Sequence, residues 1–140
     1  MLIQDAAAQL DEAYNPADLA HHLTRRARGL PFWFSLATHG TEAYEEAMEI
    51  TLQVTRDAAD MVRASKHLQL VVEPSLSIIV VRRLGWQPAD YSRWSERMLH
   101  DGIAFVVPTT YKGETVLRMC LVNPRTDPAQ MQMIFDSMRD

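Results

Sequence analysis

The sequence is poor in cysteine, in lysine and in long apolar runs. Its single cysteine, Cys120, excludes an internal disulfide, which favours a reducing, cytoplasmic compartment. No apolar stretch approaches the roughly 20 residues of a membrane-spanning helix, and the N-terminus does not have the pattern of a secretory signal. Fourteen basic against 18 acidic side chains leave a net charge of -4. The composition therefore predicts neither a membrane nor a nucleic-acid partner.

Sequence motifs of metal and nucleotide sites are also missing. The five histidines show none of the spacings of zinc sites. His21 and His22 are adjacent, so on a helix they would point about 100° apart and could not share one ion. The five glycines form neither a dinucleotide-binding fingerprint nor a phosphate-binding loop. We therefore assign no metal-ligating residue and no nucleotide loop.

What the sequence does contain is enough apolar material for one compact domain. It has 140 residues, of which 47% are apolar and 23% charged, a balance typical of globular proteins. Pro31 predicts the start of a short, largely buried helix that ends at Gly40 with a positive φ. Thr41 then caps a long helix to about Ser65. Its core-facing stripe has the 3-to-4 spacing of a helix and comprises Ala47, Thr51, Val54, Ala58, Met61 and Val62.

The second half of the chain changes to strand-like patterns. Two β-branched runs, residues 68–72 and 77–82, predict a pair of strands. Pro88 then begins a helix that Gly102 ends. Strands are predicted at residues 103–107 and 115–122, joined by a turn at residues 111–114. Asp127 and Pro128 predict the start of a last helix.

This order of elements predicts an α+β domain. Residues 41–140 read as helix, strand, strand, helix, strand, strand, helix, which suggests an antiparallel sheet of about four strands with helices on one face. Residues 1–40 are predicted to form a separate N-terminal helical arm, with a further helix start at Asn15 and Pro16. The aromatic-rich residues 30–36 need a surface to cover, which makes this arm a candidate contact for a partner.

Few residues suggest nucleophilic chemistry. Cys120 lies in an apolar strand, where a buried and inert thiol is the usual outcome. Lys66 follows the long helix and Lys112 lies in a hairpin turn, so both are expected to be solvated. Neither lysine has the desolvated setting of a Schiff-base amine.

One residue interrupts the apolar pattern of its strand. Alternation places Val116, Arg118, Cys120 and Val122 on one face, so the Arg118 guanidinium stands among apolar side chains and needs an anion. One interpretation is an internal salt bridge or a position at the sheet margin. The other is recognition of a carboxylate or phosphate by the guanidinium fork.

Three stretches together resemble a known family. The first reads RRARGLPFW at residues 25–33, with Gly40 seven residues later, the second is the strand pair at residues 73–82, and the third reads VLRMCLVNPRT at residues 116–126. In this order they resemble the C-terminal portion of the group II pyridoxal-phosphate-dependent amino acid decarboxylases, which include glutamate, aromatic amino acid and diaminobutyrate decarboxylases. The resemblance covers about residues 15–140.

The resemblance implies the C-terminal small domain of the aspartate-aminotransferase-like (type I) fold, with the long helix bridging to a large domain. It implies that Arg118 holds the substrate carboxylate. Arg25 and Trp33 would belong to a segment near the dimer interface, where Arg25 serves equally well in a structural ion pair. Tyr14 would correspond to the tyrosine of a mobile catalytic loop.

The family's large domain has no counterpart in these residues. Neither Lys66 nor Lys112 lies in the His-Lys motif that binds pyridoxal 5'-phosphate, so no residue is assigned to the cofactor and no catalytic residue is assigned beyond the candidate Tyr14. We expect the chain to be inactive alone, to require a large domain from the same or a separate chain, and to form a homo-oligomer. The alternative is a non-enzymatic α+β module that binds a small acid or a protein partner.

Overall fold

A computed structural model of the chain describes residues 26–139. Tyr14, Arg25 and the helix start predicted at Asn15 lie outside the described residues. The chain divides into two compact units, residues 1–38 and 39–140. In the described part, every helix is too short or too polar to cross a bilayer.

Helix α1 (Gly29–Ala64) is interrupted at Gly40, as the sequence predicted. Gly40 has φ 78° and ψ 164°, a conformation open essentially to glycine alone. The predicted burial of the first segment is wrong, since Phe32, Trp33 and Phe34 are 61%, 58% and 55% exposed. The side chains of Trp33 and Phe34 instead pack edge to face, with ring centres 5.0 Å apart.

The sheet contains β1 (Leu68–Val72), β2 (Ile78–Arg83), β3 (Pro108–Tyr111) and β4 (Glu114–Cys120). All pairings are antiparallel and the strand order is β1-β2-β4-β3. The turn between β3 and β4 lies where the sequence placed it. Lys112 and Gly113 have φ of 50° and 84°, the two positive values that a type I′ hairpin turn requires.

The strand predicted at residues 103–107 is wrong. The backbone N–H groups of Ile103 and Ala104 both donate to the carbonyl of Met98, at 3.0 and 3.3 Å, and so close the end of the preceding helix. The Ser95 hydroxyl donates to the carbonyl of Val106 at 2.6 Å. These bonds hold the segment against the helix, so strand pairing begins only at Pro108.

Two capped helices complete the fold, α2 (Pro88–His100) and α3 (Pro128–Asp136). Each follows a capping box, from Gln87 and Asp90 in α2 and from Asp127 and Gln130 in α3. The N–H of Gln87 donates to the Asp90 carboxylate at 2.8 Å. That bond, followed by the contact with Arg93, lowers the pKa of Asp90 below its ordinary value of 3.8. The prolines at the first turns thus mark true helix starts.

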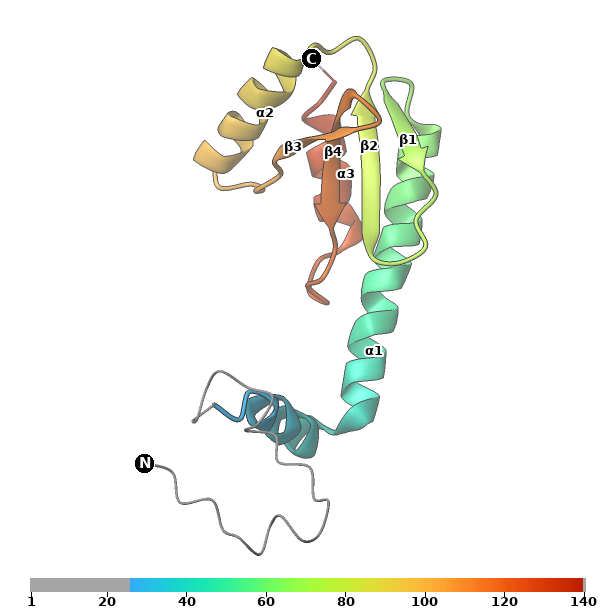
Figure 1. Cartoon of the computed structure of the whole chain (residues 1–140). Helices are drawn as coiled ribbons and strands as arrows, with labels where there is room; N and C mark the ends of the chain where they lie inside the picture. Colours follow the sequence, from blue (N-terminus) through green and yellow to red (C-terminus); the bar gives the residue numbers. More distant parts are fainter. Residues whose placement is uncertain (1–25, 140) are drawn as a thin grey trace, which may run out of the picture. The chain divides into compact units, whose positions relative to one another are not determined.

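Residues 51–62 of α1, together with α2 and α3, pack on one face of the sheet, which confirms the predicted α+β architecture. Figure 1 shows α3 behind β4, and buried side chains from α1, α2 and α3 form one core with alternate residues of β2 and β4. The strand residues of this core are Leu68, Ile79, Val81, Leu117 and Met119, and the helical ones are Val54, Ala58, Ala59, Val62, Tyr91, Trp94, Met98, Met131 and Phe135. The opposite face of the sheet carries no helix among the described residues.

Candidate functional site

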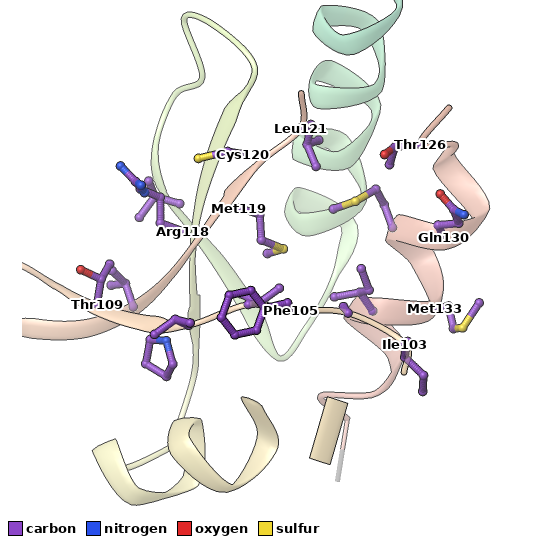
Figure 2. Close-up of a pocket in the computed structure, with 18 of the residues that line it drawn as sticks. Ile103, Phe105, Thr109, Arg118, Met119, Cys120, Leu121, Thr126, Gln130 and Met133 are labelled. Atoms are coloured by element: carbon purple, nitrogen blue, oxygen red, sulfur yellow. The ribbon is translucent and has the colours of Figure 1, made fainter. Parts of the chain in front are cut away.

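The candidate site lies on the open face of the sheet, opposite the helices. Because side chains alternate along a strand, the residues of β4 that flank Leu117 and Met119 point to this face. Figure 2 shows Arg118 and Cys120 on one side of β4 and Met119 on the other. The sequence therefore grouped Arg118 and Cys120 correctly on one face, and that face carries no helix among the described residues, although Val116 on it is buried by its neighbours.

Arg118 is exposed rather than buried. Val80 is its partner in the β2–β4 register, and Ile78 is the partner of Cys120. The Arg118 side chain forms no hydrogen bond or ion pair with any of residues 26–139. The structure therefore gives no support to the predicted internal salt bridge. Its guanidinium keeps all five N–H donors available beside apolar neighbours.

A neighbouring arginine on the same face shows the contrast. Arg82 donates to the Gln69 side chain at 2.9 Å and forms an ion pair with Glu114. The Arg82 side chain is 30% exposed and the Glu114 side chain is 58% exposed. Arg82 is therefore satisfied within the fold, whereas Arg118 is available to an external anion.

Cys120 is exposed as well, which corrects the expectation of a buried thiol. Leu117, Met119 and Leu121 occupy the core side of the strand, so the alternation leaves the sulfur of Cys120 on the open face. An exposed thiol in apolar surroundings is accessible to reagents, but it has no adjacent base among the described residues.

A hollow of about 1090 Å³ opens beside Arg118. It extends from Arg118 and Cys120 on the open face, past residues 102–111, to Met119 and α3 on the helical side of the sheet, and Figure 2 shows Phe105 between β4 and α3. Phe105, Val107 and Met133 are 72%, 54% and 54% exposed and contribute apolar surface to it. Arg118 is the one charged side chain among the residues that line this hollow. Sequence patterns did not reveal this hollow, because residues 103–107 were predicted to form a paired strand.

The residues present do not fit a covalently bound pyridoxal phosphate. A Schiff-base lysine needs a desolvated ammonium, and both lysines of the sequence, Lys66 and Lys112, are exposed. The Lys112 ammonium lies 5.3 Å from the ring centre of Tyr111 in the hairpin turn. Neither lysine lines the hollow beside Arg118. Residues 26–139 also contain no cluster of three histidine, cysteine or acidic side chains suited to a metal ion.

Comparison with known proteins identifies relatives but no family model that matches. The chain is 24% identical over 139 residues to an aromatic-L-amino-acid decarboxylase of Bacillus atrophaeus, covering 94% of this chain and 29% of the relative. It is 29% identical over 132 residues to an L-2,4-diaminobutyrate decarboxylase of Rhizobium meliloti (strain 1021), covering 91% and 27%. The chain thus spans less than a third of the length of these relatives.

Solved structures show the same fold. The crystal structure of Oryza sativa TDC with PLP and tryptamine matches with a TM-score of 0.74 and 20% identity, over 95% of this chain and 30% of that one. The glutamate decarboxylase domain of a diaminobutyrate-pyruvate transaminase and L-2,4-diaminobutyrate decarboxylase from Vibrio parahaemolyticus matches with a TM-score of 0.73 and 24% identity, over 86% and 27%. The resemblance predicted from the sequence is confirmed, as is the partial coverage.

Proposed function

Because the chain is similar in sequence and in fold to the C-terminal part of the group II pyridoxal-phosphate-dependent decarboxylases, we propose that it is the C-terminal part of an amino acid decarboxylase. It would complete an active site whose larger portion is carried by a large domain, in the same or in a separate polypeptide. The reaction is the loss of carbon dioxide from an amino acid, and the relatives named for aromatic and diamino acids define the class.

Arg118 would hold the substrate carboxylate. The observation that carries this assignment is an exposed Arg118 on the open sheet face with no partner in residues 26–139, while Arg82 on the same face binds Gln69 and Glu114. A planar guanidinium can donate two parallel hydrogen bonds to one carboxylate and so fix its orientation. Val80, its partner on β2, places apolar surface beside the guanidinium.

The cofactor would be supplied by the large domain. Pyridoxal phosphate, when bound there, provides the electron sink for the charge left by the departing carboxylate. This chain would contribute orientation, through Arg118, and apolar surface. Because Lys66 and Lys112 are both exposed and outside the hollow, we expect the chain alone to be inactive.

The exposed residues 30–36 would contribute the surface for assembly with a second copy. Leu30, Phe32, Trp33 and Phe34 are each at least half exposed, and a contiguous apolar patch of this kind is typical of an interface. Arg25 and Tyr14 would belong to the same region, at the dimer contact and the catalytic loop respectively. The cytoplasm is the compartment that we propose for the assembly.

A complementation experiment tests the proposal. The Bacillus atrophaeus relative is produced without the part that this chain matches, and the purified chain is added back in the presence of pyridoxal phosphate. We expect release of carbon dioxide from an aromatic amino acid with the wild-type chain and a loss of at least about a hundredfold with Arg118→Met, since one charged hydrogen-bond pair is worth about 3 kcal/mol. The absorbance of the bound cofactor should be the same in the mixture with wild-type chain and in the mixture with Arg118→Met.

Arg125→Met is the matched control. Arg125 is also exposed, and its side chain has no hydrogen bond or ion pair with residues 26–139, so this variant removes the same charge from the neighbouring loop. Unchanged turnover with Arg118→Met would refute the role of Arg118. Decarboxylation by the chain alone would refute the need for a large domain. Carboxylate binding without any complementation would favour the alternative, a non-enzymatic module for a small acid.

A further inference from the structure

The charge distribution around Arg118 restricts the ligands that can bind there. Among residues 26–139, Arg118 is the one charged residue that lines the hollow. The nearest acidic residue on β4, Glu114, is engaged by Arg82. A ligand that carries a carboxylate therefore finds one cation to pair with, while a ligand that carries a second ammonium finds no carboxylate among the lining residues.

The surface next to Arg118 is apolar on both sides. Val80 lies opposite Arg118 on β2. On the other side, Val107 directly precedes Pro108, the partner of Leu117 in β4, and Val107 and Arg118 line the same hollow. Val107 and Phe105 are more than half exposed and line the same hollow. A large apolar group bound to Arg118 through its carboxylate would cover side chains that are otherwise exposed to water.

We propose that the substrate held by Arg118 has a bulky apolar side chain, aromatic or branched aliphatic, and that a second ammonium group is disfavoured. This inference rests on the proposed function, because it takes Arg118 as the carboxylate contact. The physical reason is twofold. An apolar side chain gains the free energy of burial against Phe105 and Val107, whereas an ammonium group is repelled by Arg118 and loses hydration without gaining a partner.

Three probes separate the two substrate classes without the cofactor. Indole-3-propionate and 3-phenylpropionate are aromatic amino acids without their α-amino group, and 4-aminobutyrate is 2,4-diaminobutyrate without its α-amino group. Each is titrated into the isotope-labelled full chain, and amide chemical shifts are followed. We expect the two aromatic probes to bind at least about tenfold more tightly than 4-aminobutyrate, with shifts concentrated at residues 105–107 and 118–120.

Two variants assign the preference to the hollow. Phe105→Ser removes the exposed aromatic ring and should weaken indole-3-propionate about tenfold, with little effect on 4-aminobutyrate. Leu99→Ser is the matched control, because Leu99 is 56% exposed on α2 and does not line the hollow. It should leave the affinity for all three probes unchanged. Both positions are exposed, so neither substitution is expected to prevent folding.

The outcomes distinguish this inference from the proposed function. If the three probes bind with equal affinity and Arg118→Met abolishes their binding, the apolar preference is overturned and Arg118 remains a carboxylate contact. Tighter binding of 4-aminobutyrate would overturn the preference as well. Absence of any Arg118-dependent binding would overturn both the inference and the role proposed for Arg118. Equal weakening by Phe105→Ser and Leu99→Ser would show that the hollow does not bind the aromatic group.

Discussion

The hydroxyl of Tyr91 hydrogen-bonds the backbone of Arg83, where β2 has no strand partner. The substitution Tyr91→Phe tests how much these bonds stabilise the fold. The N–H of Arg83 donates to the hydroxyl at 3.0 Å, and the hydroxyl donates to the carbonyl of Arg83 at 3.1 Å. The N–H of Leu121 donates to the carbonyl of Ser77. Because backbone groups alternate in direction along a strand, the odd-numbered residues of β2 direct their N–H and C=O groups toward β4. The pairing of β2 with β4 ends at Val81, and the hydroxyl therefore satisfies both groups of Arg83.

The loss of stability can be worked out from these two bonds. Tyr91 is 2% exposed, and phenylalanine keeps its ring packing. Each hydrogen bond contributes about 1 kcal/mol net, and a donor or acceptor left without a partner costs more. Arg83 is half-buried, so water reaches part of its backbone. We expect Tyr91→Phe to lower the free energy of unfolding by about 2 kcal/mol.

Urea denaturation followed by circular dichroism measures the change. With a slope of about 2 kcal/mol per molar urea, the midpoint should fall by about 1 M while the slope is unchanged. Tyr111→Phe is the matched control, because Tyr111 is 36% exposed and its hydroxyl has no hydrogen bond with residues 26–139. Its effect should stay within about 0.5 kcal/mol. An equally small effect of Tyr91→Phe would refute the reasoning.

Three further substitutions probe the cap, the turn and the candidate site. Folding lowers the pKa of Asp90, so its contribution to stability is complete above pH 3.8 and is lost as the pH falls through the pKa of the folded state. Asp90→Asn should therefore be less stable than wild type at neutral pH, and the urea midpoints of the two proteins should converge in acid. Gly113→Ala, at φ 84°, should cost about 1 kcal/mol in thermal unfolding, and no change would argue against the turn. Arg118→Met should change unfolding by less than about 0.5 kcal/mol, and a larger loss would reveal an ion pair within the fold.

Local signals predicted most of the elements correctly. Proline at the first helical turn marks the starts of α2 and α3, and Asp127 caps α3, because these residues act through bonds within four positions. The positive φ at Gly40 and Gly113 follows from glycine's lack of a side chain. Such features depend on the chain nearby and not on the rest of the fold.

The errors came from features that depend on distant residues. Residues 103–107 are apolar and β-branched like a strand, but their amides bond to the end of α2, which local pattern does not reveal. Alternation in β4 grouped Arg118 with Cys120 correctly, yet it could not tell which face the helices cover. Leu117 and Met119 fill the core, and that choice is made by α1, α2 and α3 together.

The strand order β1-β2-β4-β3 has a consequence for how fast the domain folds. The pairs β1–β2 and β3–β4 are local hairpins, but the central pairing joins Ile78 to Cys120, roughly forty residues apart with α2 between them. Closing this loop costs chain entropy before the core contacts repay it. We therefore expect docking of the two hairpins to limit the refolding rate, with substitutions at the β2–β4 contact slowing refolding more than substitutions within either hairpin.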